Sequence, residues 1–434
     1  MANAGHTKST LDGLMKDEYS SEKLESLTPE FAILKKLIKF DSANKLGRDF
    51  VKSVSLTREH GFSYGDSITT ALANIISSNV DDAKVRGSSM TLRAGWSYGA
   101  AAAMASDKGA FINATAHKFM TMMESAAFRL ETQMIHGSKG FLVTDASNDG
   151  DAITAKQTDG STFQVKIAIN PLYYSDALVS GLENALISIY EVDSGTASGV
   201  TPTGGTLNQF SVVGVDLEKK AIIVECGLEA VADALVLELE DEAYDVYFAG
   251  AKNNEMVGLR SIVANTGSLY GINAANYSAW KGNSKTVSGN LTLKAILQGV
   301  GKAVGRGFAG KALCLVNPQT FATMANDEAA LRQYTAKTTT GDRGVSKIEY
   351  VGSNGLIEVV SHPLMWESQA IAFPADKASR IGTSDLTFNR PGFNGEMIFD
   401  MPTYGGVEAR LFSDQALFLP APGHSVIFTA VSNS

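Results

Sequence analysis

A glycine-rich segment is the first place in this sequence where residue types and spacing suggest chemistry. Gly305-Arg-Gly-Phe-Ala-Gly310-Lys311 has the spacing of a phosphate-binding loop, in which backbone N–H groups and a lysine hold nucleotide phosphates. Ala312 stands where such a loop needs a hydroxyl for magnesium. A helix is expected before the segment and a strand after it, whereas a phosphate loop leads from a strand into a helix N-terminus. The segment is therefore interpreted as a helix-to-strand turn.

A group of acidic residues is the second candidate, because carboxylate oxygens are the preferred ligands of hard cations. The group consists of Glu238, Glu240, Asp241, Glu242 and Asp245. A calcium loop also needs a fixed ligand spacing and a glycine at its turn, and this segment has neither. It is interpreted as a solvated turn, and no metal site is expected.

Histidine and cysteine offer no better arrangement. His117 and His136 lie nineteen residues apart in one expected helix, which is not the i, i+4 spacing of a zinc helix. Cys226 and Cys314 lie in apolar, strand-like segments and are expected to be buried thiols of a reduced compartment. No Gly-x-Ser-x-Gly elbow occurs, and no nucleophile is paired with a base. We expect no catalytic residue, no cofactor and no enzymatic activity.

Composition narrows the class of protein further. A chain of 434 residues with 44% hydrophobic residues is long and apolar enough for two or three domains. The net charge of -9 argues against a nucleic-acid-binding module, which needs a basic surface, but not against a container for nucleic acid. The N-terminus is polar, and the small apolar run Ala100–Ala105 is too short to cross a bilayer. A soluble intracellular product, or a part of something assembled there, is expected.

One long helix is expected to position the rest of the chain. From Phe111 to His136 a set of apolar residues recurs at spacings of three and four, which predicts a continuous apolar stripe. The stripe consists of Ile112, Ala116, Phe119, Met123, Ala127, Leu130 and Met134. Gly137 follows where a C-cap often stands. The charged residues are expected off the stripe, in water: Lys118, Glu124, Arg129 and Glu131.

The chain before this helix lacks a core of its own. Residues 1–29 are polar with scattered leucines and are expected to form an arm, followed by a short amphipathic helix over 30–40. Strands are expected at Val51–Thr57 and Met90–Tyr98, as a two-stranded excursion around a charged, glycine-containing segment. Because this excursion has few apolar residues, we expect it to rest on another subunit.

The chain after the helix is first β-rich and then mixed. A small β-rich inserted domain is expected, with strands at Val143–Ile153, Phe163–Ile169, Ser211–Val215 and Ala221–Glu225. Helices are expected at Thr292–Val304 and from Pro318 to Met324. The later strands are expected at Ala312–Val316, Ile348–Val351, Ile357–Val360, Gly406–Phe412, Ala416–Leu419 and Val426–Val431.

This order of elements resembles the major capsid proteins of tailed bacteriophages, with the fold of the Hong Kong ninety-seven type. The similar stretches are Thr28-Pro-Glu-Phe with Arg48–Gly65, Gly258-Leu-Arg-Ser-Ile-Val-Ala-Asn265, Gly271-Ile, Tyr277-Ser-Ala-Trp280-Lys-Gly-Asn283, Val316-Asn-Pro-Gln-Thr-Phe321, Pro363 with Trp366, Ala370–Pro374 and Asp376-Lys-Ala. They carry no catalytic signature, but several occur in the family's order.

The resemblance implies an α+β fold in seven parts. These are an N-terminal arm (1–50), an extended β-hairpin loop (51–105), the spine helix of a peripheral domain (106–140), a β-rich inserted domain (141–252), a peripheral connector (253–291), an axial domain (292–380) and the C-terminal strands of the peripheral domain (381–434).

It also implies a function without enzymatic chemistry. Such chains self-assemble in the host cytoplasm into hexamers and pentamers, which form the icosahedral head of the virion. The head encloses double-stranded DNA without sequence-specific binding and involves no membrane. The family's further partners are scaffolding, portal and decoration proteins.

Charged residues of the extended loop are the expected intersubunit contacts: Arg58, Glu59, Asp66, Lys84, Arg86 and Arg93. Some members of the family join a lysine of this loop covalently to a neighbour's asparagine, and Lys84 would be the donor here. Two other functions stay open, an encapsulin-like nanocompartment shell around protein cargo and a soluble hydrolase. Cargo protein in place of DNA would favour the first, and a small species with turnover the second.

Overall fold

The computed structural model describes residues 32–41, 49–66, 73–97, 108–146, 154–158, 162–192, 194–325, 347–352, 355–389, 397–401 and 405–433. The arm expected over residues 1–29 and the run Ala100–Ala105 lie outside these residues. The described chain is α+β, as expected, with sheets of five, seven and six strands and two smaller sheets of two strands.

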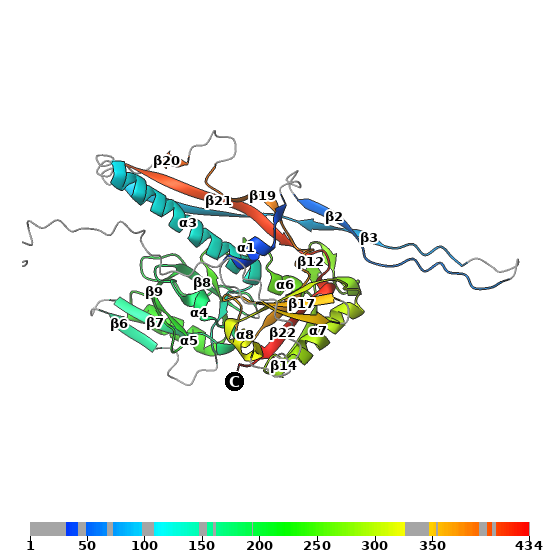
Figure 1. Cartoon of the computed structure of the whole chain (residues 1–434). Coiled ribbons are helices and arrows are strands. Elements are labelled where there is room, and N and C mark those ends of the chain that lie inside the picture. Colours follow the sequence, from blue (N-terminus) through cyan, green and yellow to red (C-terminus); the bar gives the residue numbers. More distant parts are fainter. Residues whose placement is uncertain are drawn as a thin grey trace, which may run out of the picture.

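The expected long helix is present as α3 (Lys108–His136), which runs along one side of the molecule (Figure 1). Leu130 and Met134 of the predicted stripe are fully buried, whereas Met123 is only partly buried. Met122 and Ala126 are buried against a second neighbour, Ala409 and Leu411. The helix therefore packs on two sides. The prediction that its charges lie in water is wrong for Glu131, which is fully buried.

The five-stranded sheet covers one side of α3. It has the order β1 (Phe40–Asp41), β19 (Ser379–Thr387), β21 (Gly406–Phe418) and β20 (Ile398–Asp400), with β4 (Ser88–Ser97) also paired to β21. The alternation of Leu92, Ala94 and Trp96 is confirmed, because these side chains pack against the cluster that contains Met122 and Ala126 of α3.

The expected pairing of the two strands before α3 is wrong. β4 pairs with β21 over its full length, and β2 (Phe50–Ser55) pairs instead with β3 (Val80–Val85), which the sequence did not indicate. Alternating apolar residues identify a strand and the face of it that is buried, but they do not indicate which other strand it pairs with.

The β-rich block after α3 is a seven-stranded sheet. Its order is β5 (Leu142–Val143), β11 (Tyr244–Phe248), β8 (Leu186–Glu191), β9 (Phe210–Asp216), β10 (Ala221–Glu225), β7 (Thr162–Ala168) and β6 (Thr154–Thr158). Of the strand expected over Val143–Ile153, Val143 ends β5 and Thr144 forms a single β-bridge with Ile169, whereas residues 147–153 lie outside the described residues. α4 (Asp176–Val179) and α5 (Glu229–Asp241) belong to the same block. Its apolar core is continuous with that of α3 and of the neighbouring sheets.

The six-stranded sheet has the order β14 (Asn283–Gly289), β22 (Val426–Val431), β18 (Ala370–Phe373), β15 (Ala312–Val316), β17 (Gly355–Ser361) and β16 (Lys347–Gly352). α7 (Leu293–Gly305) and α8 (Pro318–Ala325) flank it, close to the expected bounds. The last strand, β22, thus belongs to this sheet rather than to the one containing β21. The boundaries of the seven expected parts remain predictions.

Short elements connect these layers. They are α1 (Ile33–Leu37), the 3-10 turns η3 (Pro171–Tyr173), η4 (Ser278–Trp280) and η5 (Pro422–His424), α6 (Leu259–Val263), and the pair β12 (Ser268–Leu269) and β13 (Ile272–Asn273).

Candidate assembly surfaces

The β2–β3 hairpin projects far from the body of the molecule (Figure 1). Its register runs from Phe50 opposite Val85 to Ser55 opposite Val80. Beyond the strands, backbone hydrogen bonds from Leu56 N to Asn79 O (2.9 Å) and from His60 N to Ile76 O (3.1 Å) hold the two chains together. The hairpin therefore has a defined backbone although it packs on the body only near its base.

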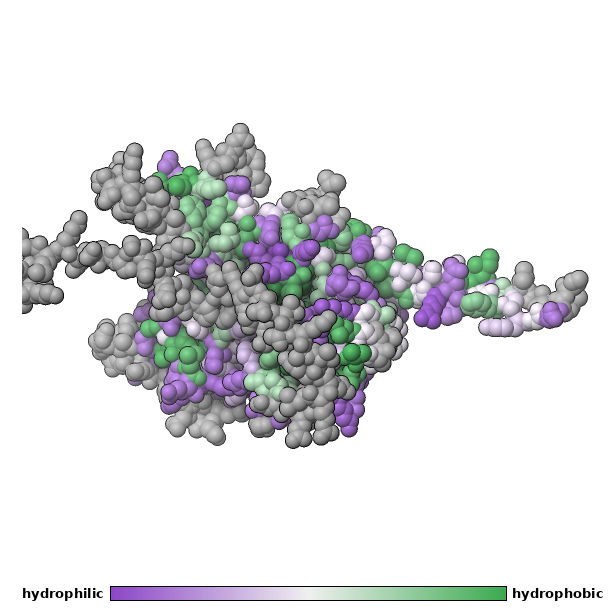
Figure 2. Space-filling view, viewed as in Figure 1, coloured by the Kyte–Doolittle hydropathy of each residue, from purple (hydrophilic) through white to green (hydrophobic). Residues whose placement is uncertain are grey.

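Large apolar side chains are exposed near the tip of this hairpin. Phe62 is 66% exposed, Tyr64 89%, Ile75 93% and Ile76 52%. Figure 2 shows hydrophobic residues along the projecting segment. Burying one such side chain contributes about 1.5–3 kcal/mol, so four of them leave a substantial free energy available to a partner surface. We refer to these four residues as the apolar tip.

The base of the hairpin is fixed by a segment that follows α6. Lys84 N donates to Tyr270 O at 2.9 Å, and the Asn79 side-chain amide donates to the Tyr277 hydroxyl. Ala83 and Val85 are buried at this junction. The base thus sets the direction in which the apolar tip extends.

The structure does not bring the six predicted contact residues together. Arg58, Glu59 and Asp66 are exposed near the tip, and Lys84 is exposed at the base. Arg86 lies 3.8 Å from Asp49 of the same subunit. All of these remain candidates for contacts between subunits.

Arg93 has a partner within its own subunit. On β4 its Nη2 lies 2.5 Å from Oε2 of Glu408, a buried residue on β21 that Arg410 also contacts. Its guanidinium is still largely exposed, so a contact with a neighbour would extend an existing ion pair.

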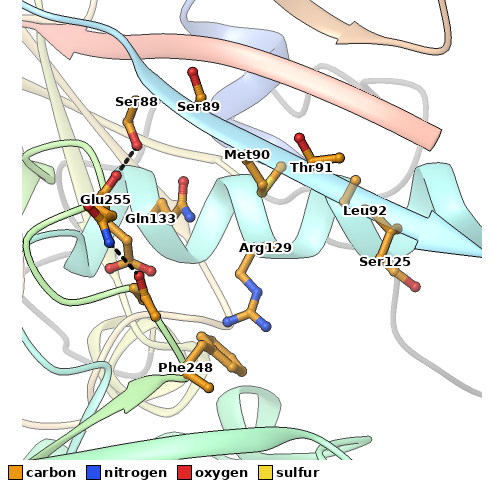
Figure 3. A pocket seen from close by; sticks show the side chains of 15 residues that line it. Ser88, Ser89, Met90, Thr91, Leu92, Ser125, Arg129, Gln133, Phe248 and Glu255 are labelled. Carbon is orange, nitrogen blue, oxygen red and sulfur yellow. Dashed lines mark hydrogen bonds between the residues drawn. The ribbon is translucent and has the colours of Figure 1, made fainter.

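A cavity of about 320 Å³ lies between α3, β4 and the turn after β11 (Figure 3). The guanidinium of Arg129 lies over the ring of Phe248, and burial lowers the pKa of Arg129 to about 9. Burial likewise raises the pKa of Glu255, which also lines the cavity. No residue that lines the cavity is a nucleophile paired with a base. Arg129 was predicted to lie in water; the turn after β11 covers it.

A second polar group is fully buried on α3. Glu131 Oε1 accepts from Lys35 N at 3.1 Å, and its Oε2 lies 3.9 Å from Nε2 of His362. One turn further, His136 Nε2 lies 2.8 Å from Leu364 O and its Nδ1 3.3 Å from Arg260 Nη1. Because a guanidinium can only donate, His136 is neutral with its proton on Nε2. Burial, and then the charge of Arg260, lower its pKa to about 3.

The structure agrees with the interpretation of the glycine-rich segment. Gly305 ends α7 and Ala312 begins β15, so a helix precedes the segment and a strand follows it. Lys311 lies 2.6 Å from Glu358.

The acidic group is less well predicted. Glu238, Glu240 and Asp241 belong to α5 rather than to a turn, and Glu238 accepts from Ser198 Oγ at 2.7 Å and from Gly199 N at 3.1 Å. Among the described residues no group of acidic, histidine and cysteine side chains could hold a metal ion.

The remaining candidates for chemistry are inert or not described. Both cysteines are buried, and burial raises the pKa of Cys226 to about 11 and that of Cys314 to about 12. His117 belongs to α3, but its side chain lies outside the described residues. In the described part of the chain, no helix is both long and apolar enough to span a membrane.

Comparison with known proteins identifies the fold. No protein-family profile and no curated protein matches the sequence. The capsid asymmetric unit of Cyanophage A-1(L) matches over 98% of this chain and 99% of that chain, with a TM-score of 0.56 and 11% sequence identity. A capsid chain of a native GTA particle matches over 99% of this chain and 100% of that chain, but with a TM-score of 0.46 and 10% identity. The chain has the capsid fold of tailed bacteriophages, of the Hong Kong ninety-seven type.

Proposed function

We propose that this chain is the major capsid protein of a tailed bacteriophage. In this function it assembles in the host cytoplasm into hexamers and pentamers, and these form the icosahedral shell of the virion around double-stranded DNA. Its role is structural. The fold supports the proposal, and the observation that carries it is the projecting hairpin with its apolar tip.

The hairpin favours assembly for a physical reason. Because the backbone of the hairpin is already ordered, little backbone conformational entropy is lost when a neighbour covers its exposed apolar side chains. In a ring each subunit both gives and receives such a contact, so a modest contact free energy is repeated around the whole shell. The charged residues beside the tip would fix the register of each contact more than its strength.

Light scattering of the purified protein tests this proposal. The parent should form capsomers or larger assemblies rather than a 46.0 kDa monomer. The double variant Tyr64→Ser/Ile75→Ser should shift toward monomer while keeping its circular dichroism, because both side chains are exposed in the subunit. Leu207→Ser, a change of another exposed apolar residue in the β8–β9 connection, is the matched control. Equal assembly of all three proteins would contradict the role assigned to the tip.

The contents of the particles distinguish this proposal from a nanocompartment. Particles isolated from an infected host should contain double-stranded DNA resistant to added nuclease. A stoichiometric cargo protein in its place would assign the shell to the nanocompartment class.

A further inference from the structure

An unusual charge distribution marks the segment from Met256 to Asn326. The segment contains seven Lys and Arg residues and no acidic residue, in a chain whose net charge is -9. All 46 acidic residues and 30 of the 37 cationic ones lie elsewhere. Two of the seven cations already have an aromatic or a charged partner inside the subunit, because Arg260 stacks on Trp366 and Lys311 pairs with Glu358. Five are left.

The fold places these five cations along one seam, where β14 and α7 lie side by side (Figure 1). We call Lys281, Lys285, Lys294, Lys302 and Arg306 the basic stripe. Lys294, Lys302 and Arg306 fall on one ridge of α7 because they are separated by multiples of four residues, and Gln298 occupies the remaining position of that ridge. From Lys294 to Arg306 the ridge is about 18 Å long.

Hydrogen bonds across the seam hold three of the five head groups, those of Lys285, Lys302 and Arg306. Lys302 Nζ donates to Ser284 O at 2.9 Å, and Lys285 Nζ donates to the Gln298 side chain at 2.7 Å. Arg306 Nη1 donates to Gly282 O at 3.2 Å and also to Lys281 O. All these acceptors are neutral, so the bonds hold the cations in place without cancelling their charge. An ammonium has three donors and a guanidinium five, so each head group retains donors for a ligand.

The described part of the chain pairs no carboxylate with the stripe. Within the described ranges, no salt bridge joins any of the five residues to an acidic side chain. The C-terminus of α7 favours cations at Lys302 and Arg306. An open groove of about 540 Å³ runs between the two elements and is lined by Lys281, Ser284, Lys302 and Arg306.

We propose that the basic stripe binds the phosphodiester backbone of double-stranded DNA, without reading its sequence. Lys and Arg head groups donating to phosphate oxygens are the common chemistry of sequence-independent DNA contact. Duplex DNA presents a charge about every 1.7 Å along its axis, so a stripe of this length faces several phosphates at once. The inference rests on the proposed function, since a shell around a genome holds such a backbone against its subunits.

Binding of a labelled random-sequence duplex to the full-length, unassembled protein tests the stripe, with fluorescence anisotropy as the readout. Light scattering of the same samples verifies that no particles form. Lys281→Gln/Lys302→Gln is the test variant, since both lysines are exposed, and Lys219→Gln, at the exposed β9–β10 turn, is the matched control. Melting temperatures of all three proteins verify folding.

The parent and the control should bind the duplex at low salt, and the test variant at least tenfold more weakly at about 50 mM salt. Each phosphate contact contributes about 0.9 to the slope of log K against log salt, so the slope of the double variant should fall by about 1.8. Equal binding by parent and test variant would overturn the inference. So would displacement of the duplex by inorganic phosphate at constant ionic strength, because this would indicate a site for a single phosphate.

Two further outcomes separate this inference from the proposed function. If the test variant loses particle assembly but keeps duplex binding, the stripe contacts an acidic surface of a second copy, and the inference is wrong. If the parent forms closed particles but its subunits bind no duplex, the inference fails and the capsid function stands. Duplex binding through the stripe by a protein that never forms particles would support the inference while the capsid function fails.

Discussion

At the scale of single residues, the most informative side chains are polar groups that α3 carries into the interior. His136 is neutral in the folded protein, held between Arg260 and the carbonyl of Leu364, with His362 and the ring of Trp366 nearby. Its pKa of about 3 lies below the ordinary value of 6.5. The unfolded chain therefore binds a proton here that the folded chain does not, and stability falls as pH falls below about 6.5.

The first prediction concerns this residue. Between about pH 6.5 and pH 5 the unassembled parent should lose about 2 kcal/mol of unfolding free energy through His136 alone. His136→Gln should be less stable at neutral pH but should lose less on acidification. Urea denaturation of both proteins at several pH values measures the difference. Parallel pH profiles of the two proteins would contradict the assigned neutral state.

A second prediction concerns Gly137, which directly follows α3. The helix ends at His136, so Gly137 stands at the C-cap position that the sequence indicated, but it does not have the left-handed backbone, which falls on Ser138 with φ of 65°. Gly137 serves instead for close approach, because an added Cβ would overlap the carbonyl oxygens of Met256 and Gln133. Gly137→Ala should cost about 1–3 kcal/mol in thermal or urea unfolding. Gly199→Ala, where a Cβ meets nothing within 4 Å, is the control and should melt like the parent.

At the scale of elements, the periodicity of apolar residues predicted where helices and strands begin and end, because local sequence determines these bounds. It did not predict which strands pair, because pairing depends on residues far away in the sequence. α3, α7, β15 and β22 were expected within a few residues of their bounds, since each has a regular apolar pattern or a clear end. The pairing of β4 with β21 joins residues more than 300 positions apart, and no local pattern encodes it. Glu131 and Arg129 were placed in water because charge predicts exposure, whereas tertiary packing covers both sides of α3.

The basic stripe was missed for a different reason. The net charge of -9 is a sum over the whole chain, and it therefore does not show that the segment 256–326 contains no acidic residue. A running charge count would have revealed the segment. The fold was still needed to show which of its cations lie together along β14 and α7.

The third prediction concerns the length of the hairpin. Replacing residues 56–79 with an Asn-Gly turn keeps β2 and β3 paired, because Ser55 lies opposite Val80. This variant should keep the parent's circular dichroism and melting temperature and should not form closed particles. Deleting 61–87 is the contrasting change, because it removes β3 with the buried Ala83 and Val85 and should destabilise the subunit. Normal assembly of the first variant would show that the hairpin is dispensable.

At the scale of the whole molecule, the chain combines a compact body with a projecting hairpin and a basic surface that are exposed in the single subunit. One apolar core runs through α3, the seven-stranded sheet and the adjoining strands, so the body is a stable unit. The hairpin extends outward (Figure 1), with its apolar tip exposed, and the basic stripe lies on the body along β14 and α7. When neighbouring subunits cover the apolar tip and the basic stripe, the subunit becomes more stable. Assembly and stability are therefore coupled by mass action.

Cryo-electron microscopy of the purified full-length protein tests the capsid assignment most directly. The expected images show closed icosahedral shells built from hexamers and pentamers, with the β2–β3 hairpin of each subunit lying on a neighbour. A uniform population of 46.0 kDa monomers at high protein concentration would contradict the assignment.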